Sequence, residues 1–185
     1  DEPLDMRMDA GVALTAADIV NDWSAEALER IFRDYGEERR ARHLARAIVK
    51  TRSREPLTSS KALAELIARC TPSAAARRQR IHPATRVFQA LRITVNRELE
   101  RLERTLPMAV DWLNPGGRLC VLSFHSLEDR IVKQCFRAMA STCTCPPRTP
   151  VCTCRTEARV RVLTRKVVRP TADEIAANPM ARSTR

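Results

Sequence analysis

The sequence predicts an α/β fold in which an all-helical part precedes the last part of a doubly wound, mostly parallel sheet. The chain has 185 residues, of which 44% are hydrophobic and 30% charged, so it is large enough for one medium-sized globular domain. Apolar residues recur at helical spacing through most of residues 15–112. A continuous apolar run at 118–124 is then followed by a polar turn and an amphipathic helix, which together form half of a βαβ unit.

The helical part begins with two short helices, of which the second is capped by Ser24 and ended by Gly36. Longer helices are expected after them, because apolar residues repeat every three or four positions over 37–52, 58–70 and 83–105. Pro107 is expected to start a short continuation of the last helix, through Trp112.

The sheet part contains two predicted strands, at 118–124 and 159–168. Ser126 is the predicted N-cap of the helix between them, and residues 171–174 form a capping box for a short final helix. Two strands do not form an independent parallel sheet, which is covered by helices on both faces and usually has about five strands or more. The sequence therefore predicts only the end of such a sheet.

The chain is strongly basic, with 33 Lys and Arg against 22 Asp and Glu and a net charge of +11. Arginine dominates, since only Lys50, Lys61, Lys133 and Lys166 are lysines. Residues 37–104 carry 17 basic and 7 acidic side chains. Because the guanidinium group binds phosphate through a planar pair of donors, this excess favours a nucleic-acid partner. A GC-rich genome is the alternative explanation of the arginine-to-lysine ratio.

The distribution of apolar and charged residues along the chain also indicates where in the cell the protein is located. No apolar run approaches the roughly 18 residues of a membrane span, and the first residues are acidic where a secretory signal is basic. A soluble, cytoplasmic protein without membrane contact is expected. The sequence gives no indication of the oligomeric state.

The chain contains only four glycines, at positions 11, 36, 116 and 117. Nucleotide-binding α/β domains use a Gly-rich turn between a strand and a helix, and neither G-x-G-x-x-G nor G-x-x-x-x-G-K-[ST] occurs here. Either the domain is of another type, or the part that binds the cofactor is missing from the chain.

The carboxyl end of the first predicted strand is the expected place for chemistry, because ligands of open α/β sheets bind there. Ser123, His125 and Ser126 lie at this end. Helix capping alone accounts for Ser126 and for the acidic residues after it, but not for His125. A Ser-His-Asp hydrolase is disfavoured, because no G-x-S-x-G elbow is present.

Four cysteines form the pattern C-x-C-P-P-x4-C-x-C, at positions Cys143, Cys145, Cys152 and Cys154. Four thiolates in so short a loop can surround one Zn²⁺ tetrahedrally. Two disulfides, which a reducing cytosol disfavours, and thiols without either role are the alternatives. Cys70, Cys120 and Cys135 stand alone in apolar patterns and are expected to be small core residues.

Several phrases of the sequence together resemble the bacterial 16S rRNA cytosine-N4 methyltransferases of the RsmH (MraW) family. They cover nearly the whole chain: DMRMD (5–9), ADIVN (17–21), YGEER (35–39), ARAIV (45–49), HPATRVFQALRITVNRELERL (82–102), GGRLCVLSFHSLEDRIVK (116–133) and NPMARS (178–183).

This resemblance implies an S-adenosylmethionine-dependent enzyme with a class I, Rossmann-like methyltransferase domain, interrupted by an all-helical inserted subdomain that recognises the substrate. It implies that residues 1–13 end the first half of the methyltransferase domain, that 14–82 are the insertion, and that 83–185 are the second half. In the family the Gly-rich cofactor turn precedes DMRMD, so the chain is expected to be a C-terminal portion that lacks the cofactor-binding segment and is inactive alone. No residue of it is assigned to the cofactor.

The resemblance also implies the site and the partner, which is 16S rRNA in the small ribosomal subunit. His125, Ser126 and Ser123 are expected to border the target-base pocket, with Asp5, Arg7 and Asp9 on its opposite wall. Gln89, Arg92 and Asn96 share one helix face and are expected to support or contact them, although such a face is also typical of solvated helix surface.

The basic middle of the chain is expected to bind rRNA phosphates. The candidates are Arg39, Arg40, Arg42, Arg46, Arg52, Arg54, Arg77, Arg78 and Arg80. A non-catalytic RNA-binding protein, stabilised by a zinc loop of four cysteines, is the alternative function.

Overall fold

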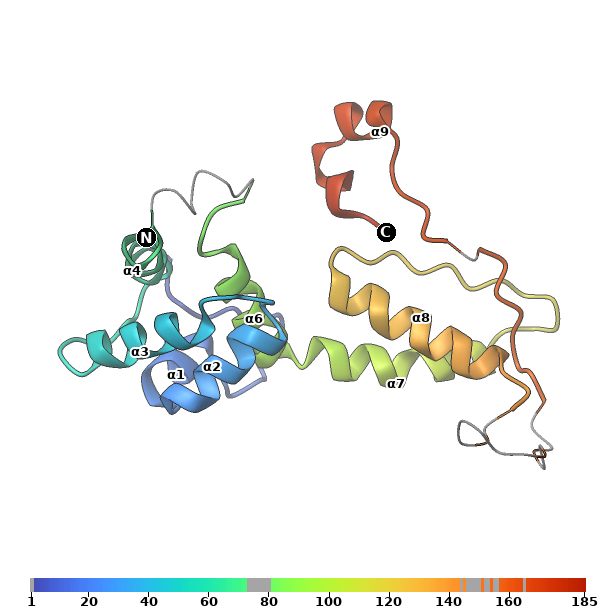
Figure 1. Ribbon diagram of the computed structural model, residues 1–185, viewed down its shortest axis with the longest axis horizontal. Coiled ribbons are helices and arrows are strands. Elements are labelled where there is room, and N and C mark those ends of the chain that lie inside the picture. Colours follow the sequence, from blue (N-terminus) through green and yellow to red (C-terminus); the bar gives the residue numbers. More distant parts are fainter. Residues whose placement is uncertain are drawn as a thin grey trace. The chain divides into compact units, whose positions relative to one another are not determined.

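A computed structural model describes residues 2–72, 81–143, 145, 151, 154, 157–164 and 166–185 (Figure 1). The chain divides into two compact units, Asp1–Glu98 (unit 1) and Leu99–Arg185 (unit 2). Each unit is built differently, and each is described by itself below.

Unit 1 is a bundle of α-helices. Its described helices are α1 (Ala16–Asp22), α2 (Ala25–Asp34), α3 (Ala41–Arg52), α4 (Ser60–Cys70) and α6 (Thr85–Asn96). Helix α2 packs against α3 and α6, α1 packs against the same two helices, and α4 packs against α3. Ser24 caps α2 by accepting from the Ala27 main-chain N–H, which confirms the predicted start of this helix. The predicted helical character of this part of the chain is therefore confirmed for the described residues.

The core of unit 1 is formed by the apolar stripes that gave the helices their periodicity. Each helix contributes side chains with at most 3% of their surface exposed, among them Leu28, Phe32, Leu44, Ile48, Leu63, Ile67, Val87 and Leu91. Burial of these stripes is the main source of stability for the unit, because isolated helices of this length are only marginally stable in water.

Gly36 allows the end of α2 to approach α6 closely. A Cβ atom at this position would lie 2.6 Å from the Arg86 carbonyl oxygen and 2.7 Å from the Phe32 carbonyl oxygen. The C-cap of α2 is Tyr35. The residue with a left-handed conformation is Glu37, which follows Gly36 and has a φ of 48°. The glycine is thus required by the space between two main chains and not by a positive φ.

The long helix predicted over 83–105 is two helices, and the predicted restart at Pro107 is wrong. Arg97 adopts a left-handed conformation, with φ of 51° and ψ of 40°, and separates α6 from α7 (Glu98–Asp111). Pro107 lies inside α7, where it removes only one main-chain hydrogen bond. The adjacent Leu106 is buried, with 4% of its surface exposed.

Unit 2 contains most of α7, followed by α8 (Ser126–Ala140), α9 (Ala172–Ala177) and the 3₁₀-helix η1 (Pro179–Ser183). The capping box predicted at 171–174 is confirmed, because Thr171 and Glu174 exchange side-chain and main-chain hydrogen bonds at the start of α9.

The two predicted strands are not confirmed by the residues that the structure describes. Residues 118–124 and the described residues of 159–168 have no strand assignment. Ser123 exchanges two main-chain hydrogen bonds with Arg185, of 3.0 and 2.8 Å, but a strand needs such pairing along its length. The apolar side chains of Leu122 and Phe124 are 65% and 55% exposed. The segment therefore has strand composition without neighbouring strands to hydrogen-bond with.

Unit 2 has a small core. Among its described hydrophobic residues, Leu106 and Leu127 are buried, whereas Trp112, Leu163 and Val168 are all more than half exposed. Arg159 connects the returning chain to both long helices of the unit. Its main-chain N–H donates to the Met139 carbonyl oxygen of α8, and its guanidinium group pairs with Asp111 of α7. A cavity of about 520 Å³ lies between residues 110–119, Phe136 and residues 159–164.

Of the helices in the described part of the chain, none has the length and apolar composition needed to cross a bilayer.

Candidate functional site

The loop at residues 5–9 is fixed to α6 by Asn96. The Asn96 side chain is 2% exposed and accepts from the Met8 main-chain N–H at 2.8 Å. Its amide group donates to the Met6 and Arg92 carbonyl oxygens, each at 2.9 Å. Met6 has a positive φ of 63°, which these bonds help to hold. Asn96 thus positions the loop that carries Asp5, Arg7 and Asp9.

Asp5 and Arg7 form a two-pronged ion pair within this loop. Arg7 Nε and Nη2 donate to the two Asp5 carboxylate oxygens at 2.8 and 2.9 Å. The hydrogen bonds from Arg7 lower the pKa of Asp5 to about 2. Asp5 is therefore an ionised acceptor at neutral pH and too weak a base to take a proton there. Arg7 also donates to the Val12 carbonyl oxygen at 2.9 Å, which folds the loop back on itself.

The other predicted substrate residues of unit 1 have protein partners in the structure. Gln89 donates to the Tyr35 carbonyl oxygen at 3.0 Å. Arg92 binds both carboxylate oxygens of Glu98, at 2.8 and 3.1 Å, across the break between α6 and α7. Asp9 accepts from the Gly11 main-chain N–H at 2.8 Å. These contacts give each residue a structural role, and their contact with substrate stays a prediction.

In unit 2, His125 is the N-cap of α8, and the prediction of Ser126 as the cap is wrong. The His125 Nδ1 atom accepts from the Glu128 main-chain N–H at 3.4 Å. The Glu128 carboxylate accepts in turn from the main-chain N–H groups of His125 and Phe124, at 3.2 and 2.8 Å. Histidine completes this capping box because its Nδ1 reaches the position that a serine hydroxyl oxygen usually takes.

Ser123 lies two residues before this cap and is 4% exposed. Its hydroxyl group donates to the Arg185 carbonyl oxygen at 3.5 Å. The structure thus brings Ser123, His125 and Ser126 to the start of α8. Asp5, Arg7 and Asp9 belong to unit 1, so a pocket shared by the two groups stays a prediction.

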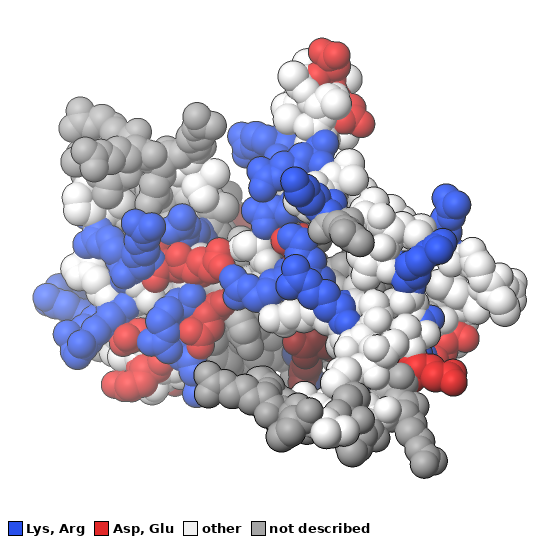
Figure 2. Space-filling view, turned by 45° about the vertical axis from the view of Figure 1, so that its right-hand side comes forward, with Lys and Arg blue, Asp and Glu red and all other residues white. Residues whose placement is uncertain are grey.

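Four of the predicted phosphate ligands are exposed side chains of unit 1: Arg39, Arg42, Arg46 and Arg54. Arg42 and Arg46 lie four residues apart on α3, and Lys50 continues the same helix face after four more residues. In the described part of the chain, no carboxylate lies at ion-pair distance from these three side chains. Figure 2 shows basic side chains gathered in groups on the face drawn there, with acidic side chains between them.

Two of the predicted phosphate ligands are hydrogen-bonded to main-chain carbonyl oxygens of unit 1. Arg40 donates to the Cys70 carbonyl oxygen at the end of α4, at 2.5 Å, and Arg52 donates to the Val20 carbonyl oxygen of α1, at 2.6 Å. Lys50 was not predicted, although its spacing from Arg46 was visible in the sequence. Arg77, Arg78 and Arg80 lie outside the described residues.

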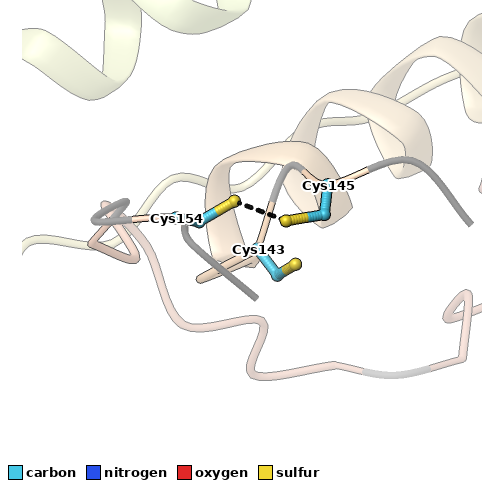
Figure 3. Close-up of side chains that lie close together, drawn as sticks. All are labelled: Cys143, Cys145 and Cys154. Carbon is cyan, nitrogen blue, oxygen red and sulfur yellow. Dashed lines mark hydrogen bonds between the residues drawn. The ribbon is translucent and has the colours of Figure 1, made fainter. Parts of the chain in front are cut away.

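Three cysteines come together beyond the end of α8 (Figure 3). The sulfur atoms of Cys143, Cys145 and Cys154 all lie within 4.8 Å of one another, and those of Cys145 and Cys154 are 3.2 Å apart. Cys143 is exposed and the other two are half-buried. Cys152, the fourth predicted ligand, lies outside the described residues.

The four glycines, all of them described residues, do not form the Gly-rich turn with which Rossmann-like domains bind their cofactor. Gly11 lies in the loop beside Asp9, Gly36 in the contact between α2 and α6, and Gly116 and Gly117 in the turn after α7. None of the four lies between a strand and a helix. That this chain holds no cofactor-binding residue stays a prediction.

Comparison with known proteins extends over the whole chain. Residues 1–185 match the MraW methylase family. Relatives from several bacteria carry the name Ribosomal RNA small subunit methyltransferase H, among them the following three. The protein from Desulforapulum autotrophicum is 57% identical over 185 residues, covering 100% of this chain and 59% of the relative. That from Desulfosudis oleivorans is 54% identical with the same coverage, and that from Thermomicrobium roseum is 57% identical over 183 residues, covering 99% of this chain and 55% of the relative.

The chain thus spans less than two thirds of the length of these curated relatives. The match nevertheless includes the loop at residues 5–9, helix α3 and the capping box at the start of α8. The chain belongs to the MraW methylase family.

Proposed function

We propose that the protein to which this chain belongs methylates the N4 amine of a cytidine in 16S rRNA of the small ribosomal subunit, with S-adenosylmethionine as methyl donor. The observation that carries the proposal is the 57% identity, over all 185 residues, to a relative named as a ribosomal RNA small subunit methyltransferase. Within the chain, residues 14–82 are the helical part that recognises rRNA, and 1–13 and 83–185 belong to the methyltransferase domain. Such a substrate places the protein in the cytoplasm.

The contribution of this chain is to bind and orient the base. A cytosine buried in a stack must be extruded and held by its Watson–Crick edge before its amine can react. The amine is a weak nucleophile, because its lone pair is conjugated into the ring, so orientation at near-attack distance is the main requirement. Asp5, which Arg7 keeps ionised, is an acceptor for the amine hydrogens, and His125 and Ser126 border the base from the start of α8.

Methyl transfer to purified small ribosomal subunits tests this function directly. Full-length protein is incubated with labelled S-adenosylmethionine and subunits that lack the modification, and the nucleosides of the digested rRNA are separated by mass spectrometry. We expect label in N4-methylcytidine. Label in another nucleoside would contradict the assignment of the atom. Tight rRNA binding without any transferred label would support the alternative of a non-catalytic RNA-binding protein.

Two substitutions at His125 separate its proposed role at the base from its role as a helix cap. Asparagine is a good N-cap, so His125→Asn preserves the start of α8 and removes the imidazole, whereas His125→Ala removes both. We expect His125→Asn to melt like the wild type and to lower kcat/KM by roughly 5-fold or more, since a lost pocket hydrogen bond costs about 1–3 kcal/mol. A kcat/KM within about twofold of wild type for His125→Asn would show that His125 is only a cap.

A further inference from the structure

We propose that Cys143, Cys145 and Cys154 bind a structural Zn²⁺ ion that closes the loop after α8. This site is independent of the methyltransferase function proposed above. Its basis is the approach of three thiol groups to within 4.8 Å of one another, two of them from one C-x-C pair and the third, Cys154, nine residues after Cys145 (Figure 3). Cysteine sulfur is the preferred ligand of structural zinc.

The spacing of the sulfur atoms fits a metal better than a disulfide. Tetrahedral zinc with Zn–S bonds of about 2.3 Å places its sulfur ligands roughly 3.8 Å apart. The observed separations, 3.2 Å between Cys145 and Cys154 and at most 4.8 Å for the set, bracket this value. A disulfide brings two sulfur atoms to about 2.05 Å, which is well short of the Cys145–Cys154 distance. Three thiolates leave one position of the tetrahedron for a further protein group or water.

The surrounding main chain brings Cys154 back to Cys143 and Cys145. The Ser141 hydroxyl group donates to the Cys143 carbonyl oxygen at 2.7 Å, which turns the chain sharply after α8. Farther along, the Arg159 main-chain N–H donates to the Met139 carbonyl oxygen at 2.8 Å, so the returning segment meets the same end of α8. The loop thus leaves and returns at one point, with the thiols between.

A metal would supply stability that the apolar residues of unit 2 do not. Leu106 and Leu127 are its buried hydrophobic residues in the described part of the chain, and small cores of this kind are commonly stabilised by metals or disulfides. Each thiol loses its proton to solvent when the metal binds, so the affinity falls as the pH is lowered. Zinc has no redox chemistry, and the role of the ion here is structural.

Metal analysis of the full-length protein tests the site. The protein is purified without chelator, under reducing conditions, from medium supplemented with zinc, and its metals are measured by mass spectrometry. We expect about one zinc per chain in the wild type and at least a tenfold lower content in Cys143→Ser, Cys145→Ser and Cys154→Ser, as expected when a ligand is removed. Cys120→Ser is the matched control, because Cys120 lies in the same unit outside the cluster, and it should retain the wild-type content.

A second measurement uses only the wild type, so that a variant that fails to fold does not decide the result. After chelation, Co²⁺ is added in place of zinc, and we expect near-ultraviolet absorption from thiolate-to-cobalt charge transfer together with the strong visible bands of tetrahedral cobalt. Added zinc should abolish both. Zinc content below a tenth per chain, an unchanged content in Cys145→Ser, or octahedral cobalt without charge-transfer absorption would each overturn the proposal. A loss of two thiols without bound metal would show a disulfide instead and would also overturn it.

Discussion

At the scale of single residues, the ion pair of Asp5 with Arg7 links the chemistry of the loop at 5–9 to its stability. The hydrogen bonds from Arg7 lower the pKa of Asp5 from 3.8 to about 2, and they require the loop conformation that Asn96 holds. A carboxylate whose native pKa lies below its unfolded value stabilises the native state above the unfolded pKa. This stabilisation disappears as the pH falls through the native pKa.

We therefore predict that Asp5→Asn removes part of the acid sensitivity of the chain. Between about pH 4 and pH 2, the free energy of unfolding of unit 1 should fall more steeply in the wild type than in Asp5→Asn, and this difference in slope should vanish once the pH lies below about 2. Urea unfolding at a series of pH values measures this difference. Arg7→Gln should remove the same part of the slope, and the double variant no more than either single one. Parallel curves for wild type and Asp5→Asn would show that the pair does not exist in solution.

The same scale shows which site residues the sequence could and could not predict. The shared face of Gln89, Arg92 and Asn96 followed from helical spacing, but the partners of these side chains did not, because they lie on other elements. Asn96 contacts a loop about 90 residues away in the chain. The sequence predicts the correct turn for His125, but not its capping role, because serine is the commoner N-cap.

At the scale of elements, the packing of α2 on α6 depends on the absence of a side chain at Gly36. We predict that Gly36→Ala lowers the free energy of unfolding of unit 1 by about 1–3 kcal/mol, because the added Cβ meets two main-chain carbonyl oxygens that cannot rotate away. Fluorescence of Trp23, which packs against the core, reports the unfolding in urea, provided that the exposed Trp112 is first replaced by Phe.

Gly11→Ala is the matched control for this prediction. Its Cβ meets only the end of the Asp9 side chain, at 3.2 Å, and that carboxylate can move by a few tenths of an ångström at the expense of its hydrogen bond with the Gly11 main-chain N–H. We expect it to change the stability by less than about 0.5 kcal/mol. Equal effects of the two substitutions would show that helix propensity or chain entropy, and not the contact between α2 and α6, accounts for the result.

Helix α3 carries basic side chains of two kinds. Arg52 is hydrogen-bonded to α1, whereas Arg42, Arg46 and Lys50 are exposed and available to RNA. We predict that replacing Arg42, Arg46 and Lys50 by glutamine in one variant makes the slope of log K against log salt for rRNA binding shallower by about 2. Each lost phosphate contact contributes roughly 0.7–0.9 to this slope. The melting temperature should stay unchanged, because these side chains are exposed. Filter binding at several salt concentrations measures the slope.

Two sets of control variants show whether the effect is specific to the exposed side chains of α3. Arg101→Gln with Arg104→Gln removes exposed charges from α7 and should leave the slope near that of the wild type. Arg40→Gln or Arg52→Gln should instead lower the stability, since each removes a hydrogen bond to a main-chain carbonyl oxygen. If the α3 triple variant kept the full salt dependence, rRNA would have to bind elsewhere.

Element by element, the sequence predicted helices well and strands poorly, for a physical reason. A helix satisfies its main-chain hydrogen bonds locally, so the apolar spacing around Leu44 and Ile48 was enough to predict α3. A strand needs a neighbour, and the composition of residues 118–124 indicates only that the segment would suit one. The break at Arg97 was missed because no glycine or proline marks it.

At the scale of the whole molecule, the two units differ in how much apolar surface they bury. Unit 1 buries side chains from each of its described helices, whereas exposed Leu122, Phe124 and Leu163 remain in unit 2. Local stability follows buried contacts and protected hydrogen bonds, so different parts of one chain can open with different free energies. The 185-residue chain should therefore lack a single cooperative unfolding transition.

Hydrogen exchange followed by mass spectrometry tests this difference peptide by peptide. We predict that amides of α2, α3 and α6 in the 185-residue chain exchange only through unfolding of unit 1, at rates slowed by roughly a thousandfold or more if the unit has a stability of about 5 kcal/mol. Amides at 118–122 should exchange at nearly the rate of an unfolded chain, because the described hydrogen bonds of this region begin at Ser123. Protection of 118–122 equal to that of α2 would mean that the segment is paired as a strand in solution, as its composition predicts. The same experiment on the full-length protein then shows whether additional chain protects these amides, and protection confined to that protein would identify 118–124 as a strand completed by residues outside the 185.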